Sequence, residues 1–195
     1  MMNKSVEHYL FHKENFLDEK YCENCVNELN EEPWNKHDWY NHQADSWHAA
    51  SGDNEPEVFN MEINSKNVQK INEFIIQELH STIKEYIERC QFDWFTGIEG
   101  YSALKFLRYH PGQTMRNHCD HIHSLFDGER RGIPILSIIG ILNDDYEGGE
   151  LIMFEDKKID TKKGDIILFP SNFLYPHKIA PVVKGVRYSY VSWIW

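Results

Sequence analysis

The chain has few cysteines, an excess of acidic over basic residues, and no long apolar segment. Only 4 of its 195 residues are cysteine, too few for the disulfide framework of a small secreted domain. Lys and Arg number 20 against 31 Asp and Glu, and the net charge of −11 argues against general nucleic-acid binding, which relies on clustered basic residues. An anionic small molecule must therefore be bound by a local cation.

The longest apolar run, at residues 133–142, is interrupted by Pro134, Ser137 and Gly140. It is too short to span a bilayer. Residues 1–30 contain no apolar stretch of the kind found in secretory signals. We therefore expect a cytoplasmic protein without a membrane segment. The chain length and a hydrophobic content of 41% predict one domain over residues 1–195.

Cys22 and Cys25 have the CxxC spacing found in redox pairs and in half of a zinc site. The sequence contains no second pair of this kind. The segment from Asp18 to Asn30 is predicted to be a helix that begins at an Asp cap. We therefore interpret the two cysteines as residues on one face of a helix, without a functional role.

Residues 1–101 are predicted to be helical or irregular and to support the rest of the domain. A helical stripe of apolar residues predicts a long packing helix over Ser65 to Cys90, and its members are Val68, Ile71, Ile75, Leu79, Ile83 and Ile87. The stretch from Trp34 to Phe59 mixes aromatic residues and histidines with many polar residues. It is expected to be a surface loop anchored by its aromatics, and a lid over a site is the alternative.

Residues 102–195 are predicted to form a β core. Segments rich in β-branched and aromatic residues alternate with turn signals such as Pro111-Gly112 and Gly148-Gly149. The predicted strands are Ala103 to Tyr109, Ile135 to Leu142, Glu150 to Phe154, Asp165 to Phe169 and Val186 to Trp195. Several short strands at this spacing favour a sandwich or barrel over a βαβ sheet.

His118 and Asp120 are the first candidates for chemistry. Side chains two apart in an extended segment point to the same side, so these two can present an imidazole nitrogen and a carboxylate oxygen to one metal ion. His177 is the best-placed third ligand. Two histidines and one carboxylate leave positions open on the ion, which is typical of non-haem Fe(II) oxygenases, whereas a structural zinc site closes its shell.

His-x-Asp alone is a common pattern, and a solvated loop histidine is the simpler interpretation of it. A rival register also exists, in which His121 and His123 form a His-x-His pair of the kind found in cupins. The residues around the two registers decide between them.

The string Tyr-His-Pro-Gly-Gln-Thr-Met-Arg-Asn-His-Cys-Asp runs from Tyr109 to Asp120 and surrounds the first register. It resembles the tyrosine, glycine and His-x-Asp pattern of the prolyl 4-hydroxylase-like family of 2-oxoglutarate oxygenases. Further matches follow in order up to Trp193: Leu142-Asn143, Gly148-Gly149-Glu150-Leu151, Gly164-Asp165 through Phe169, His177 and Arg187.

The resemblance implies a mainly β fold, a double-stranded β-helix or jelly roll with N-terminal helices packed on one sheet. It implies that His118, Asp120 and His177 bind iron. It also implies that Arg187 binds the far carboxylate of 2-oxoglutarate, a task suited to the planar fork of an arginine. A surface arginine in a terminal strand is the alternative interpretation of Arg187.

Two further residues are candidates for the co-substrate site. Ser189 resembles the serine of an Arg-x-Ser pattern in related oxygenases, and Tyr109 matches a tyrosine near the co-substrate in prolyl hydroxylases. In one respect the chain departs from the family: Ile141 stands where some prolyl hydroxylases have a tyrosine that touches the co-substrate. That contact is then absent or made by Ser189 or Tyr109.

The implied activity is hydroxylation of an aliphatic C–H group with release of succinate and CO2. The cofactors are Fe(II), 2-oxoglutarate and O2, with ascorbate as a further candidate. A prolyl residue in a peptide or protein is the first substrate candidate, and a free amino acid or other small molecule is the second. A cupin-like protein that binds metal and a carboxylate without chemistry is the rival. Candidates for the substrate path are Arg116, His121, His123, Tyr146 and Trp193. The oligomeric state is not readable from the sequence.

Overall fold

The computed structural model describes residues 4–36, 38–41, 46–49, 59–61, 65–91, 97–98, 100–120 and 134–195. Its helical elements are the 3-10 helix η1 (Val6–Tyr9) and the α-helices α1 (Glu19–Asn30) and α2 (Lys66–Cys90). The strands before residue 102 are β1 (Phe11–Lys13), β2 (Asn35–Lys36), β3 (Asp38–Asn41), β4 (Ser46–Ala49) and β5 (Phe59–Met61). The later strands are β6 (Lys105–Tyr109), β7 (Met115–His118), β8 (Leu136–Ile141), β9 (Glu147–Gly148), β10 (Leu151–Met153), β11 (Lys157–Ile159), β12 (Ile166–Pro170), β13 (His177–Ile179), β14 (Val182–Lys184) and β15 (Arg187–Ile194).

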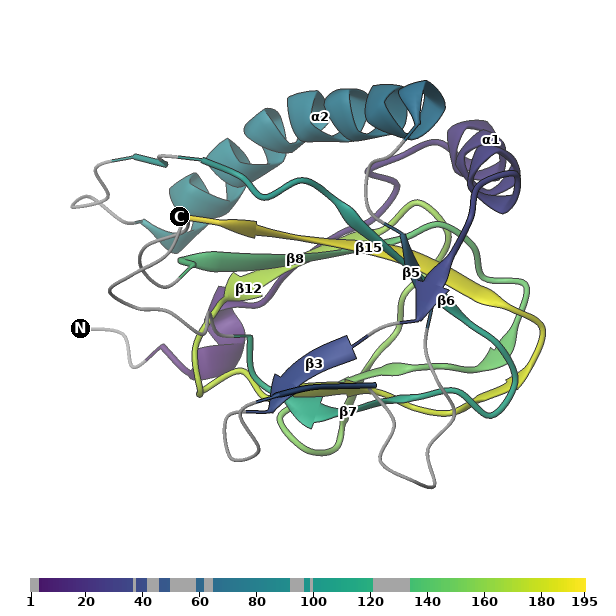
Figure 1. Cartoon of the computed structure of the whole chain (residues 1–195). Helices are drawn as coiled ribbons and strands as arrows, with labels where there is room; N and C mark the ends of the chain where they lie inside the picture. The colour runs from purple at the N-terminus through teal and green to yellow at the C-terminus, as the bar shows by residue number, and fades with distance from the viewer. Residues whose placement is uncertain are drawn as a thin grey trace.

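Two antiparallel sheets form the body of the molecule. The larger sheet has the order β1-β12-β8-β15-β6-β5-β2, and the smaller has the order β11-β10-β13-β7. Figure 1 shows α1 and α2 on one side of the sheet that contains β8 and β15, with β7 on the other side. The smaller pairs β14-β9 and β3-β4 complete the described strands.

The apolar residues form an outer and an inner cluster, one on each face of the larger sheet. The outer cluster joins the helices to that sheet and includes Ile75, Leu79, Ile138 and Tyr190. The inner cluster lies between the two sheets and is made of Leu107, Tyr109, Met115, Ile139, Ile141, Leu151, Met153, Ile159, Ile167, Phe169, Tyr175, Ile179 and Val182. The predicted mainly β jelly-roll fold with helices on one sheet is therefore confirmed.

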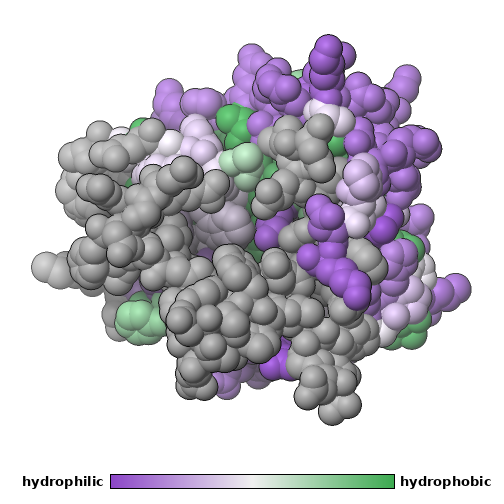
Figure 2. All heavy atoms as spheres, viewed as in Figure 1, coloured by the Kyte–Doolittle hydropathy of each residue, from purple (hydrophilic) through white to green (hydrophobic). Residues whose placement is uncertain are grey.

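Both predicted helices are present, and side chains cap them as the sequence indicates. The Asp18 carboxylate accepts a hydrogen bond from the Tyr21 amide at 2.8 Å, and Ser65 Oγ accepts one from the Val68 amide at 3.2 Å. Such caps satisfy amides that the first helical turn leaves unpaired. Cys22 and Cys25 are buried free thiols of the outer cluster, which confirms that they are packing residues. On the face shown in Figure 2, hydrophilic residues gather over the helices.

The predicted strands of the β core are confirmed as β6, β8, β10, β12 and β15. The prediction that the chain before Ser102 is only helical or irregular is wrong, because β1 pairs with β12 and β5 pairs with β6. These strands are three residues long. Segments this short show no clear alternation of polar and apolar residues, and pairing with longer strands stabilises them.

The prediction of a loop from Trp34 to Phe59 is also wrong for its described part. β2 pairs with β5 at the edge of the larger sheet, and β3 and β4 form an antiparallel pair. Both pairs are held by hydrogen bonds between backbone groups. Polar and aromatic residues have the same backbone groups as aliphatic residues, so a polar composition does not exclude strands. Much of this stretch lies outside the described residues, so the alternative of a lid over the site is not tested.

Candidate metal centre

His118 and His177 occupy facing positions on two paired strands. β7 ends at His118, β13 begins at His177, and the two residues are register partners in the antiparallel pair. Their ring centroids lie 4.3 Å apart. The predicted third ligand therefore faces the first across a pair of antiparallel strands.

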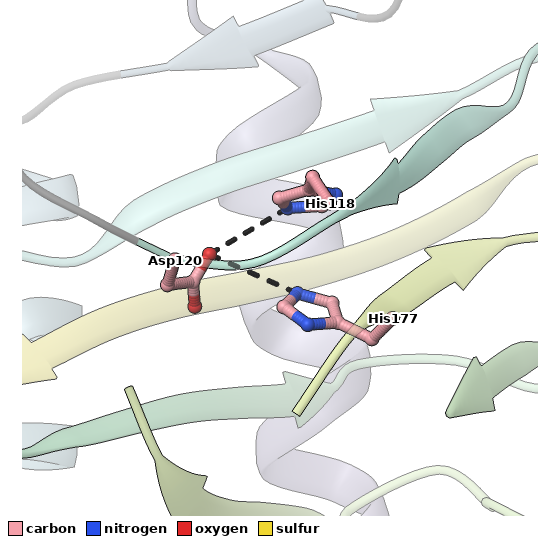
Figure 3. A group of neighbouring side chains, drawn as sticks. All are labelled: His118, Asp120 and His177. Carbon is pink, nitrogen blue, oxygen red and sulfur yellow. Dashed lines mark ion pairs between the residues drawn. The ribbon is translucent and has the colours of Figure 1, made fainter. Parts of the chain in front are cut away.

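Asp120 completes the cluster from just beyond the end of β7. Its Oδ1 atom lies 3.5 Å from Nε2 of His118 and 3.8 Å from Nε2 of His177. In Figure 3 the carboxylate faces both imidazole rings. All three ligand atoms lie within 4.8 Å of one another, a separation that suits one shared metal ion.

Backbone hydrogen bonds orient both imidazole rings. Nδ1 of His118 lies 2.8 Å from the carbonyl oxygen of Arg116, and Nδ1 of His177 lies 3.1 Å from that of Tyr175. A carbonyl oxygen only accepts, so Nδ1 carries the proton in both rings. The Nε2 atoms are left with the lone pairs that a metal ion requires.

The charges in this cluster also suit a metal ion. Burial by itself raises the pKa of the Asp120 carboxyl, but its polar neighbours, His118 and then His177, outweigh burial and hold that pKa well below its usual range. Burial lowers the pKa of His177, against the opposing effect of Asp120. At neutral pH the carboxylate is therefore ionised and His177 is neutral, and these are the forms that bind metal.

Arg187 is a buried cation at the start of β15. Its side chain is 1% exposed, and Nη1 donates a hydrogen bond to Ser189 Oγ at 2.7 Å. The guanidinium carbon lies 5.3 Å from the ring centre of Tyr109, its register partner on β6. Nε and Nη2 are buried and have no hydrogen-bond partner within the described part of the chain. The alternative of a surface arginine is therefore wrong.

Arg187, Ser189 and Tyr109 are thus brought together as the resemblance implied. Gly149 packs against this group with a φ of +66°, and a Cβ at this position would lie 3.1 Å from Cδ of Arg187. Ile141 is the register partner of Ser189 and is fully buried in the inner cluster. An isoleucine side chain offers no hydrogen bond, so the contact that the family's tyrosine makes is either absent here or made by Ser189 or Tyr109.

The other predicted site residues are distributed as follows. Arg116 is an exposed residue of β7, and Tyr146 and Trp193 are partly buried. His121 and His123 lie outside the described residues, so the structure does not test the rival register. Sequence reasoning missed the carbonyl groups of Arg116 and Tyr175, because backbone orientation leaves no signal in residue types.

Within the described residues, no helix is long and apolar enough to cross a membrane.

Comparisons with known proteins agree with this geometry. A profile described as the 2OG-Fe(II) oxygenase superfamily matches residues 104–195. A PKHD-type hydroxylase of Idiomarina loihiensis is 33% identical over 90 residues, covering 45% of this chain and 39% of the relative. A PKHD-type hydroxylase of Alteromonas mediterranea is 35% identical over 96 residues, covering 46% and 41%. The matched region thus spans well under half of these relatives.

Two solved structures are similar over nearly the whole chain. A viral collagen prolyl hydroxylase from Paramecium bursaria Chlorella virus-1, in complex with 2OG, has a TM-score of 0.64 and 17% identity, with 95% of both chains covered. A prolyl hydroxylase from Trichoplax adhaerens, in complex with a hypoxia inducible factor peptide, has a TM-score of 0.68 and 19% identity, covering 96% of this chain and 84% of that one. At these identities the likeness shows the fold.

The superfamily is defined by its use of Fe(II) and 2-oxoglutarate with O2, and the His118, Asp120 and His177 donor set fits Fe(II). The unpartnered nitrogens of Arg187 likewise fit a carboxylate. The ordered motifs that carried the resemblance thus lie almost wholly inside residues 104–195, the region that is similar to the 2OG-Fe(II) oxygenase superfamily.

Proposed function

We propose that this chain is an Fe(II)- and 2-oxoglutarate-dependent dioxygenase that hydroxylates an aliphatic C–H group. The observation that carries the proposal is the cluster of His118, Asp120 and His177, which we propose as the iron ligands. Two imidazole nitrogens and one carboxylate oxygen bind one face of the ion and leave the other positions for co-substrates. A closed structural site needs a fourth protein ligand, and the described residues offer none in this cluster.

Arg187 is proposed to bind the far carboxylate of 2-oxoglutarate. Among the residues that the structure describes, none accepts a hydrogen bond from Nε or Nη2 of this buried guanidinium, which is unfavourable, and a bound carboxylate supplies two acceptors in matching geometry. This cation also offsets the net charge of −11, which otherwise repels a dianion.

Ser189 and Tyr109 are proposed as the neighbours of that carboxylate. Ser189 Oγ accepts the hydrogen bond from Arg187, so the proton of its own hydroxyl remains for donation to the ligand. Burial raises the pKa of Tyr109 to about 12, against the opposing effect of Arg187. Its hydroxyl therefore stays protonated at neutral pH and remains a donor.

When bound, Fe(II) and 2-oxoglutarate supply the oxidation that places one atom of O2 in the product and the other in succinate, with release of CO2. The residues of this chain orient the ligands and exclude water. Phe169 of the inner cluster packs edge-on against His177, with ring centroids 5.0 Å apart, and closes that side of the centre to solvent.

A prolyl residue in a peptide or protein is the proposed substrate. The support comes from the prolyl hydroxylases among the similar structures, one of which holds a peptide fragment. A free amino acid or another small molecule is the second candidate. No residue that the structure describes favours one of these two substrate classes over the other. The assay below compares them directly.

Residues 1–195 are proposed to form a single domain. Two observations support this organisation: β1 adds to the larger sheet beside β12, and the outer cluster contains residues from α1, α2 and that sheet. Removal of residues 1–101 would expose the apolar outer face of β8 and β15, so the remaining β core should not fold alone.

The test is an assay with Fe(II), ascorbate and 2-oxoglutarate, in which succinate is measured with and without substrate. A panel of proline-containing peptides is compared with free proline and other amino acids by mass spectrometry. A gain of one oxygen atom on a peptide proline is the expected result. Oxidation of a free amino acid alone would move the substrate to the second candidate. Metal binding without any succinate would favour the cupin-like binding protein and overturn the proposal.

A further inference from the structure

Tyr175 contacts a proposed metal ligand through its backbone and the N-terminal turn through its side chain. Its carbonyl oxygen lies 3.1 Å from Nδ1 of His177 and accepts the proton of that ring. Its hydroxyl donates a hydrogen bond to the carbonyl oxygen of Val6, the first residue of η1, at 2.9 Å. Val6 and Tyr175 are 169 residues apart in the chain. One side chain therefore connects the first helical element to the metal centre.

The carbonyl group that orients His177 lies outside the paired strands. β13 begins at His177, so Tyr175 precedes this strand by two residues. The carbonyl group that orients His118, in contrast, belongs to Arg116, which lies inside β7. The Tyr175 amide donates to the carbonyl oxygen of Asn172 at 3.0 Å and closes a tight turn. The position of the Tyr175 carbonyl therefore depends on this turn and on how the Tyr175 side chain is anchored.

The Tyr175 ring is packed among other aromatic rings of the same region. It is 3% exposed and stacks on Phe169, with ring centroids 6.2 Å apart and an interplanar angle of 25°. Phe154 also contacts it, with centroids 5.7 Å apart. Phe169 contacts the His177 ring as well, so one phenylalanine touches both Tyr175 and the proposed ligand. Because protein interiors are closely packed, a shift of the Tyr175 ring would also displace its neighbours.

We propose that Tyr175 is a positioning residue for His177, and that its hydrogen bond to Val6 makes η1 part of the support of the metal centre. This inference rests on the proposed function, because it takes His177 as a metal ligand. The group that accepts the second ring proton of a metal-binding imidazole fixes its orientation, and loss of such partners weakens metal affinity or activity by about ten- to a hundredfold. A change of the Tyr175 side chain disturbs that group without removing a ligand atom.

The chain offers a matched control in Tyr86. This residue is 1% exposed, and its hydroxyl donates to the carbonyl oxygen of Tyr9, the last residue of η1, at 3.1 Å. Both tyrosines thus hold the same turn by a backbone carbonyl group. Tyr86 belongs to α2 and to the outer cluster, on the face of the larger sheet turned away from the metal centre. Tyr86→Phe therefore loosens η1 as Tyr175→Phe does, but on the side away from His177.

The experiment measures Co(II) affinity and the visible absorption of bound Co(II) for the metal-free full chain and its variants, together with thermal unfolding. Tyr175→Phe removes only the hydroxyl, and the loss of one hydrogen bond should weaken Co(II) binding by about two- to tenfold. Tyr175→Leu also removes the aromatic ring, so affinity should fall by about ten- to a hundredfold and the Co(II) absorption should change. Tyr86→Phe should keep wild-type affinity and absorption even if its unfolding temperature falls.

Tyr175→Phe decides the question if Tyr175→Leu does not fold, because it keeps the ring and adds no bulk. Asp120→Ala is measured in parallel and should lose Co(II) binding. Given that loss, wild-type Co(II) affinity in Tyr175→Phe, or an equal weakening in Tyr86→Phe, would overturn the inference and leave the proposed function standing. Wild-type affinity in Asp120→Ala would remove the proposed function and this inference with it.

Discussion

His177 lies directly opposite His118 in the antiparallel pair of β13 and β7, with ring centroids 4.3 Å apart. Each ring is also held through Nδ1 by the carbonyl group two residues before it, that of Tyr175 or Arg116. Strand pairing and backbone hydrogen bonds together direct both Nε2 atoms toward Asp120. A ligand set on rigid strands of this kind binds its ion with little rearrangement.

The first prediction concerns these three residues. His118→Ala, Asp120→Ala and His177→Ala should each abolish succinate formation and greatly weaken Fe(II) binding, because each variant leaves only two of the three donors within 4.8 Å of one another. Metal content after anaerobic loading and single-turnover succinate yield are the measurements.

The control variants come from the rival register. His121→Ala and His123→Ala should keep the metal, since neither residue belongs to the proposed ligand set. If His121 or His123 proved essential for iron while His118 did not, the His121-x-His123 pair would replace His118 and Asp120 in the assignment.

The strands that could be predicted from sequence are those with their own apolar pattern. β8 reads Leu-Ser-Ile-Ile-Gly-Ile and is buried throughout, so its residue types alone indicate a central strand. β7 reads Met-Arg-Asn-His and β13 has only three residues, His177 to Ile179. These two become strands because they pair with each other and β13 also pairs with β10. A pairing between distant segments has no signal in either segment, which is why the sequence did not show it.

Tyr190 offers a prediction about the outer cluster. Its hydroxyl is buried without a hydrogen-bond partner in the described part of the chain, and its ring covers Gly140. Tyr190→Phe keeps the ring and removes the unpaired hydroxyl, so the free energy of unfolding should stay unchanged or rise. Tyr86→Phe is the matched control, because Tyr86 is equally buried and its hydroxyl donates to the carbonyl of Tyr9 at 3.1 Å.

Urea unfolding of both variants makes the comparison. Tyr86→Phe should lose about 1 kcal/mol, the usual net value of one hydrogen bond. A loss of that size in Tyr190→Phe would show that its hydroxyl has a partner and would contradict the prediction.

More of the candidate site than of the surrounding fold could be predicted from the sequence. The ordered motifs name the residue types that bind metal and carboxylate, whereas strand pairing leaves no such pattern. His118, Asp120, His177 and Arg187 were all assigned in this way. The partners of these side chains were not, since they depend on register and close packing. Tyr175 looks like any other tyrosine in the sequence until the fold brings its carbonyl oxygen to Nδ1 of His177.

Gly149 illustrates the same point and leads to a prediction. It has a left-handed φ of +66°, and a Cβ would lie 3.1 Å from Arg187, Tyr146 and Val182 at once. Gly149→Ala should therefore lower stability by about 1–2 kcal/mol through backbone strain, and it should also displace Arg187 and raise the apparent 2-oxoglutarate requirement. Gly97→Ala is the control for strain alone, because Gly97 also has a positive φ but a Cβ there meets nothing within 4 Å. An unchanged 2-oxoglutarate requirement in Gly149→Ala would show that Arg187 tolerates the added methyl group.

The last prediction concerns Arg187, since it separates an oxygenase from a protein that only binds metal. Arg187→Met removes the buried cation together with Nε and Nη2, the proposed donors to the carboxylate, and charge-assisted hydrogen bonds are worth about 1.5–3 kcal/mol. The apparent 2-oxoglutarate requirement should rise by about ten- to a hundredfold, while Fe(II) affinity stays nearly unchanged.

Two variants calibrate that result. Ser189→Ala removes one hydrogen bond and should cost about 1 kcal/mol, seen as a smaller rise in the same requirement. Arg187→Lys keeps the positive charge but not the planar guanidinium. Its apparent 2-oxoglutarate requirement should therefore lie between those of Arg187→Met and the wild type. The measurement is succinate formation at varied 2-oxoglutarate, with metal content determined in parallel.

An Arg187→Met protein that consumed 2-oxoglutarate with wild-type kinetics would show that another cation binds the far carboxylate. Arg108 is a poor replacement, because its guanidinium carbon lies 4.5 Å from the ring centre of Trp34, a residue packed against the outer cluster. Lys105 alternates along β6 with Leu107 and Tyr109 of the inner cluster and therefore faces the barrel. Lys105→Met would then be the next variant, and its 2-oxoglutarate requirement would decide whether the carboxylate binds at the opposite end of β6 from Tyr109.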